Sequence, residues 1–117
     1  MAALTFQETA LLAALKGKAR EAGYDTLRIT TSSDGVVAHG FPRIVRDGKP
    51  RTRMYQICVD LHLHGWARDG GNSVLMYAFS EPHNLLYNIA AKRGTLSNTP
   101  VGASWHTYYT AEWDLGA

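Results

Sequence analysis

A carboxylate and two imidazoles recur at alternate positions within residues 57–66, which read Ile-Cys-Val-Asp-Leu-His-Leu-His-Gly-Trp. On a β-strand, Asp60, His62 and His64 would share one face, each roughly 7 Å from the next. Neutral imidazoles and a carboxylate together suit Zn²⁺ or Mn²⁺. A strand with one face in water also needs polar residues at alternate positions, so the same row is typical of a surface or an interface. We favour the surface or interface interpretation, with a metal site as the alternative.

The other face of this segment is apolar, and it supports the structural prediction. Alternation places four aliphatic side chains there, which we expect to pack in the core: Ile57, Val59, Leu61 and Leu63. We therefore expect residues 54–66 to form the longest strand of the chain and the centre of a sheet.

His62-Leu63-His64 also resembles the His-hydrophobic-His motif of the HUH endonucleases, which act in replication initiation and conjugation. In that family two histidines of a central strand hold a metal ion and a tyrosine attacks DNA. The resemblance implies Tyr87 as the nucleophile, on a helix that also carries Lys92. A metal-dependent DNA-nicking enzyme is therefore the alternative function.

Positive charge is concentrated in a short turn-rich segment. Five of the twelve cationic side chains fall within eleven residues, with one aspartate among them: Arg43, Arg46, Lys49, Arg51 and Arg53. A projecting basic hairpin can contact the phosphates of a nucleic acid. It can equally pair with an acidic protein neighbour, and the sequence does not favour one partner over the other.

Other catalytic signatures are absent from the sequence. The chain has no glycine-rich phosphate loop, nucleophile elbow or His-Glu-x-x-His motif, and its single cysteine, Cys58, cannot form an intrachain disulfide. We therefore predict no catalytic residue and no cofactor, and favour a protein that is not an enzyme.

Length and composition indicate one folded domain over residues 1–117. Hydrophobic residues make up 45% of the chain and charged residues 19%, which excludes disorder by composition. The net charge of +2 excludes binding driven by overall positive charge. No run is long and apolar enough to cross a membrane, so we expect no membrane contact and a location in the cytoplasm.

Local signals predict two helices and several strands. Thr5 and Glu8 have the spacing of a capping box, and Gly23 can end a helix in the left-handed conformation. Apolar spacing and turn residues then predict the following elements: helices at 6–22 and 82–93; strands at 27–30, 36–39, 54–66, 74–79 and 104–113; and a loop at 95–102. This order describes an α+β fold with a mainly antiparallel sheet, an N-terminal helix and a second helix before the last strand.

The order and size of these elements resemble the tail-terminator and tail-completion proteins of tailed phages, which are small α+β subunits that close into a ring. The resemblance implies a non-enzymatic assembly or interaction protein whose partners are copies of itself or other protein subunits. It also implies a location in the host cytoplasm or in a virion. Three Trp and six Tyr suit such contacts. A small phage inhibitor and a single-stranded nucleic-acid-binding module that uses the basic hairpin are further alternatives.

Overall fold

A computed structural model of the chain describes residues 2–32, 35–43, 50, 52–63, 66–69, 72–77 and 81–116. The first element, α1 (Phe6–Ala22), has the predicted bounds. The Thr5 hydroxyl accepts a hydrogen bond from the Glu8 amide at 3.1 Å, and the Glu8 carboxylate accepts one from the Thr5 amide at 2.9 Å. Gly23 ends the helix with φ +104°. Both end signals act within one turn of the helix, which is why the sequence located them.

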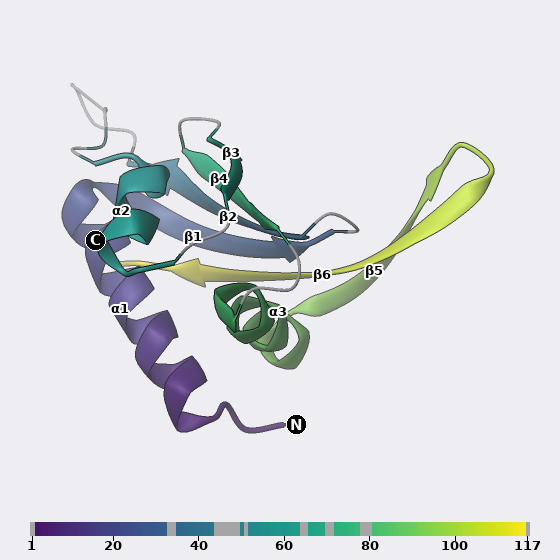
Figure 1. Cartoon of the computed structure of the whole chain (residues 1–117), viewed down its shortest axis with the longest axis horizontal. Helices are drawn as coiled ribbons and strands as arrows, with labels where there is room; N and C mark the ends of the chain where they lie inside the picture. The colour runs from purple at the N-terminus through teal and green to yellow at the C-terminus, as the bar shows by residue number, and fades with distance from the viewer. Residues whose placement is uncertain are drawn as a thin grey trace.

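The described strands form one six-stranded antiparallel sheet in the order β3-β4-β2-β1-β6-β5 (Figure 1). Their bounds are β1 (Tyr24–Thr31), β2 (Gly35–Pro42), β3 (Trp66–Asp69), β4 (Ser73–Tyr77), β5 (Thr95–Val101) and β6 (Ser104–Asp114). The α+β class is therefore confirmed, and the strands predicted near 27–30, 36–39, 74–79 and 104–113 correspond to β1, β2, β4 and β6. The centre of the sheet is the β1–β2 hairpin.

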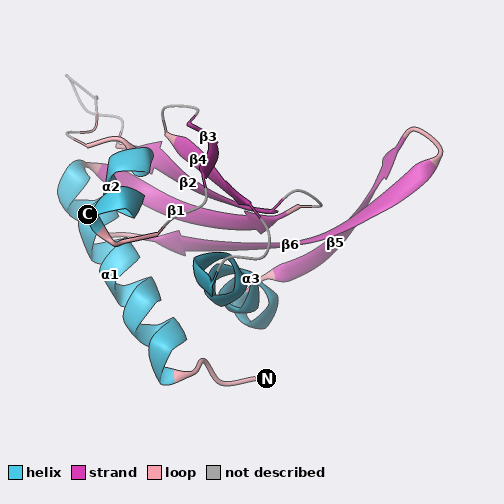
Figure 2. Cartoon of the chain, viewed as in Figure 1, coloured by secondary structure: helices cyan, strands magenta, loops and turns pink. Residues whose placement is uncertain are grey.

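Three described helices pack against one face of this sheet: α1, α2 (Met54–Asp60) and α3 (Glu81–Arg93) (Figure 2). The buried cluster includes Leu12 and Leu15 of α1, Ile89 of α3 and Leu27 and Ile29 of β1. No helix in the described ranges covers the opposite face of the sheet. The helix predicted at 82–93 is confirmed, one residue longer at its start.

The long strand predicted at 54–66 is wrong. Residues Met54–Asp60 form α2, and the next described strand, β3, begins at Trp66. The segment fits two periods at once, because Met54, Ile57, Cys58 and Leu61 also have the i, i+3, i+4, i+7 spacing of a helix. The first three of these side chains are buried against the core, so tertiary packing selects the helical period.

The loop predicted at 95–102 is also wrong, because residues Thr95–Val101 form β5. A two-residue turn, Gly102-Ala103, joins β5 to β6. Gly102 has φ +62° and Ala103 does not have a positive φ, which fits a type II′ turn, in which the first central residue alone takes a positive φ. Asn98 and Pro100 are poor strand formers in general, yet here they lie at the edge of a sheet, where Pro is tolerated.

Candidate interaction surface

The β5–β6 hairpin extends beyond the rest of the sheet as a two-stranded ribbon. Strand β6 pairs with β1 only from Thr110 to Asp114, whereas it pairs with β5 from Ser104 to Thr110. Residues 104–109 of β6 therefore pair with a described strand on one side alone. Figure 1 shows this part of the hairpin projecting away from the helices and the other strands. We call residues 95–109 the ribbon.

Thr31 marks the point where the ribbon leaves the sheet. Its side chain is 3% exposed, and its hydroxyl accepts a hydrogen bond from the Tyr109 amide at 2.8 Å. The main chain of Tyr109 therefore points toward β1 and away from β5. Because hydrogen-bonded and non-hydrogen-bonded pairs alternate along an antiparallel ladder, Leu96, which lies opposite Tyr109, directs its own N–H and C=O outward.

The same alternation defines the whole free edge of β5. Asn98 also directs its N–H and C=O away from β6, whereas Ser97 and Thr99 bond to β6. The main chain of Pro100 also faces away from β6, a position that suits a residue without an N–H. Its C=O can still accept a hydrogen bond. At the other end, the Gly94 amide donates to the Ala90 carbonyl at 2.7 Å. Among the described residues, the main-chain donors of this edge that lack a partner are therefore those of Leu96 and Asn98.

Aromatic and aliphatic side chains gather at the base of the ribbon. The rings of Tyr87 on α3 and Tyr109 on β6 meet edge to face, with centroids 6.2 Å apart and planes 79° apart. Leu96 lies opposite Tyr109 on the same face and is 51% exposed. Tyr87 is 39% exposed. These three residues form an apolar surface that water contacts in the isolated chain.

The ribbon sequence contains no formal charge. Residues 94–111 include no Lys, Arg, Asp or Glu, although such residues make up 19% of the whole chain. The opposite edge of the sheet is different, because β3 is four residues long, includes Arg68 and Asp69, and has a register shift against β4. Shortness, charge and bulges protect sheet edges from pairing with other chains. Strand β5 has seven regular pairs and only Pro100 as a protective residue.

The open face of the sheet carries a row of side chains that contact each other. Arg28 Nε lies 3.0 Å from Glu112 Oε2, and its guanidinium lies 4.5 Å from the centre of the Phe41 ring. The His39 ring stacks on Phe41 at 4.3 Å. Burial, followed by the charge of Arg28, lowers the pKa of His39. One ion pair and two ring contacts thus link β6, β1 and β2 on this part of the face.

The predicted metal row does not lie on one strand. Asp60 ends α2, where its carboxylate accepts a hydrogen bond from Gln56 at 2.9 Å, and His62 follows in an exposed turn with φ +59°. His64 lies outside the described residues. Among the residues that the structure does describe, no three His, Cys, Asp or Glu side chains gather closely enough to hold a metal ion.

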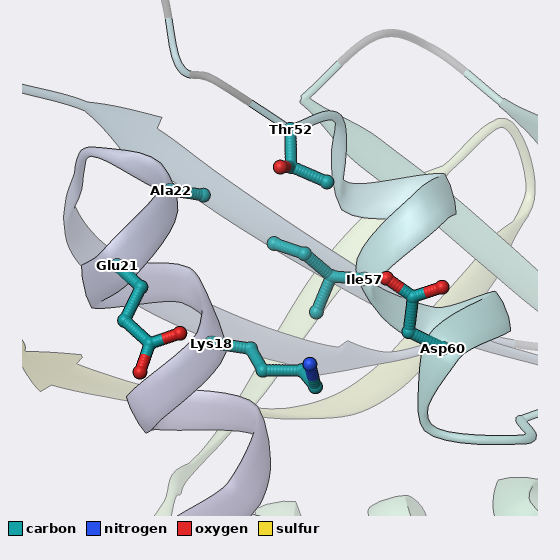
Figure 3. Close-up of a pocket in the computed structure, with 6 residues that line it drawn as sticks. All are labelled: Lys18, Glu21, Ala22, Thr52, Ile57 and Asp60. Carbon is teal, nitrogen blue, oxygen red and sulfur yellow. The ribbon is translucent and has the colours of Figure 1, made fainter.

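Asp60 instead lines a cleft of about 290 Å³ between α1 and α2 (Figure 3). The side chain of Lys18 extends toward Asp60, whereas the carboxylate of Glu21 points away from both (Figure 3). The cleft is completed by Ala22, Thr52 and Ile57. One ammonium group therefore accompanies the inward carboxylate of Asp60.

The residues proposed for DNA nicking have structural contacts. Tyr87 packs on Tyr109, and Lys92 donates a 2.7 Å hydrogen bond to the buried carboxylate of Glu8. The hydrogen bond to Lys92 is the main cause that lowers the pKa of Glu8. This ion pair joins α1 to α3 and engages the Lys92 ammonium.

The basic segment is only partly described. Arg43 Nε lies 2.8 Å from Asp25, and its guanidinium donates to the Gly116 carbonyl at 3.0 Å. Arg53 lies immediately before α2 and is exposed. The other members of the predicted hairpin, Arg46, Lys49 and Arg51, lie outside the described residues. The Arg43 side chain therefore links the end of β2 to Asp25 of β1 and to Gly116.

Of the two strands of the ribbon, β6 was predicted from the sequence, whereas β5 was expected to be a loop. The signal for the hairpin was a pair of Thr-rich and aromatic segments separated by two turn residues, Gly102 and Ala103.

Comparison with known proteins gives no relative for this chain: no family model, no curated protein and no solved structure matches it. None of the helices in the described part of the chain has both the length and the apolar character required to span a bilayer.

Proposed function

We propose that this chain is a non-enzymatic assembly subunit that binds protein partners through the β5–β6 ribbon. The observation that carries the proposal is the outer edge of β5. There Leu96 and Asn98 direct main-chain groups away from β6, and no described strand pairs with them. An isolated two-stranded hairpin is marginal in water. A partner that pairs with this edge would stabilise the ribbon and satisfy its donors.

The chemistry of the ribbon favours protein over nucleic acid as the partner. Binding to phosphates depends on Lys and Arg side chains that release counterions, and residues 94–111 contain neither. Protein interfaces are instead enriched in Tyr and Trp and poor in charge at their centre. The exposed Leu96 beside Tyr87 and Tyr109 fits that description.

The specific form that we propose is a structural subunit of the phage tail-terminator or tail-completion kind. Support comes from the order of elements alone: an N-terminal helix, a largely antiparallel sheet, and a helix before the final strands. Such likeness in architecture is weaker support than the ribbon, because one fold serves many functions.

Light scattering of the purified full-length chain tests the assembly proposal. We expect a defined oligomer that is lost in the variant Leu96→Lys/His106→Lys, which places one cation on each face of the ribbon. The control Gln7→Lys/Ala14→Lys adds two lysines at exposed positions of α1 and should assemble like the wild type. A wild-type chain that stays monomeric at high concentration, or a ribbon variant that assembles normally, would overturn the proposal.

A further inference from the structure

We infer that the partner of the β5 edge is a second copy of this chain, paired antiparallel to β5 across a two-fold axis at Asn98. This inference rests on the proposed function and specifies its contact. The two sheets would join into one continuous sheet, with β5 of each copy at the junction.

The main-chain groups of the edge match each other in this register. The two Asn98 residues face each other and exchange a pair of N–H···O=C bonds. Leu96 of each copy then lies opposite Pro100 of the other copy, and its N–H donates to the Pro100 carbonyl. Pro100 has no N–H to leave unpaired. Every outward amide donor between Leu96 and Pro100 is therefore satisfied in both copies.

The side chains of the edge also match in this register. Directly opposite residues of neighbouring strands project to the same face, so each Leu96 packs against Pro100 of the second copy. Both residues are exposed in the single chain. The Asn98 amides lie side by side at the axis, where each can donate to the other. Pairing thus removes apolar surface from water at two symmetric positions.

Electrostatics and symmetry favour a second copy over other protein partners. Like charges oppose the close approach of identical surfaces, and residues 94–111 carry none. The charged and bulged β3 edge is a poor alternative for β5 to pair with. A two-fold contact between identical patches closes on itself, and such dimers are the commonest oligomers of soluble proteins.

A pair of substitutions at Asn98 isolates the outward main-chain donor. Asn98→Pro removes the N–H that points away from β6 and should leave the hairpin intact, as Pro100 does two residues later. Asn98→Ala removes the side chain and its hydrogen bond with Thr107, but keeps the N–H. Light scattering should show a dimer for the wild type and for Asn98→Ala, and a monomer for Asn98→Pro. Circular dichroism should show the same fold for all three.

Disulfide trapping tests the register. Cysteines at a directly opposed pair lie about 5.5 Å apart between Cα atoms, within the range of a disulfide. Asn98→Cys should therefore form a covalent dimer under mild oxidation, whereas Thr107→Cys, one strand farther from the axis, should not. The native Cys58 does not interfere, because it is buried and its burial raises its pKa to about 12.

The outcomes separate this inference from the proposed function. An assembly that is lost in Leu96→Lys/His106→Lys but persists in Asn98→Pro, without trapping at Asn98→Cys, would overturn the β5 pairing and support another contact of the ribbon. A wild-type protein that is monomeric, or an assembly that persists in every ribbon variant, would overturn both the β5 pairing and the proposed function.

Discussion

The buried hydroxyl of Thr31 accepts a hydrogen bond from the Tyr109 amide at 2.8 Å, at the position where a further main-chain pair of β1 and β6 would otherwise form. A side chain thus ends the ladder, and within the described part of the chain β6 continues into the ribbon paired with β5 alone. The contact fixes the position at which the ribbon departs and the direction in which Leu96 turns its main chain.

Thr31→Val should remove this contact with little change in shape. The Tyr109 amide then loses its acceptor, which we expect to cost about 1 to 3 kcal/mol in the free energy of unfolding. Denaturant unfolding measures the loss. Thr30→Val is the control, because that hydroxyl makes only a 3.4 Å contact with Thr110, and its cost should stay within about 0.5 kcal/mol. Equal costs for the two variants would contradict the role given to Thr31.

Lys92→Met should destabilise the packing of α1 on α3. The substitution keeps the aliphatic stem but leaves the carboxylate of Glu8, which is 2% exposed, without its cationic partner. Breaking a buried pair in this way costs about 3 kcal/mol or more. The double variant Glu8→Gln/Lys92→Met should be more stable than Lys92→Met, because no charge is then buried. Urea unfolding of the three proteins would contradict the account if the double variant were the least stable.

Acid should weaken the same ion pair over a defined range. The pKa of Glu8 in the folded chain is lowered from its ordinary value of 4.5, first by the hydrogen bond from Lys92. Its stabilising contribution is therefore complete above pH 4.5 and is lost as the pH falls toward the folded pKa. The difference in unfolding free energy between wild type and Lys92→Met should shrink over that range. A difference that does not change with pH would exclude the ionised pair as its source.

His39 should give a second and separate pH dependence. Burial, and then Arg28, lower its pKa in the folded chain below 6.5, so the unfolded chain takes up the proton first as the pH falls. Stability should therefore decrease as the pH falls from 6.5 toward the folded pKa of His39. His39→Gln should flatten the stability profile there. A wild-type profile that rises toward acid in this range would contradict the lowered pKa.

Local signals predicted the elements whose ends they determine. The capping box at Thr5 and Glu8 and the left-handed Gly23 gave α1 its bounds, since each acts through neighbouring residues. The strand predicted over residues 54–66 was wrong because two periods fitted the same apolar residues. Contacts of α2 with α1, β2 and β4 favour the helix. Propensity alone cannot choose between patterns that tertiary packing decides.

The candidate site was less predictable than the fold. Asp60 and His62 have side chains that can bind a metal ion, but the predicted metal row required both residues to lie on one strand. Asp60 instead ends the helix α2. Strand β5 was missed because Asn98 and Pro100 are residue types typical of loops. Only their pairing with β6 shows that they lie in a strand. Which strand lies at the edge of a sheet depends on the pairing of all its strands, so no short sequence motif predicts it.

Hydrogen exchange of the β5 amides tests the central claim most directly. In a free ribbon, Ser97 bonds to β6 and is protected, whereas the outward amides of Leu96 and Asn98 exchange quickly. We predict that in the concentrated wild-type protein all three amides are protected together, and that dilution restores fast exchange at Leu96 and Asn98 alone. Fast exchange at Leu96 and Asn98 in the concentrated, assembled protein would show that β5 is not the contact and would contradict the account.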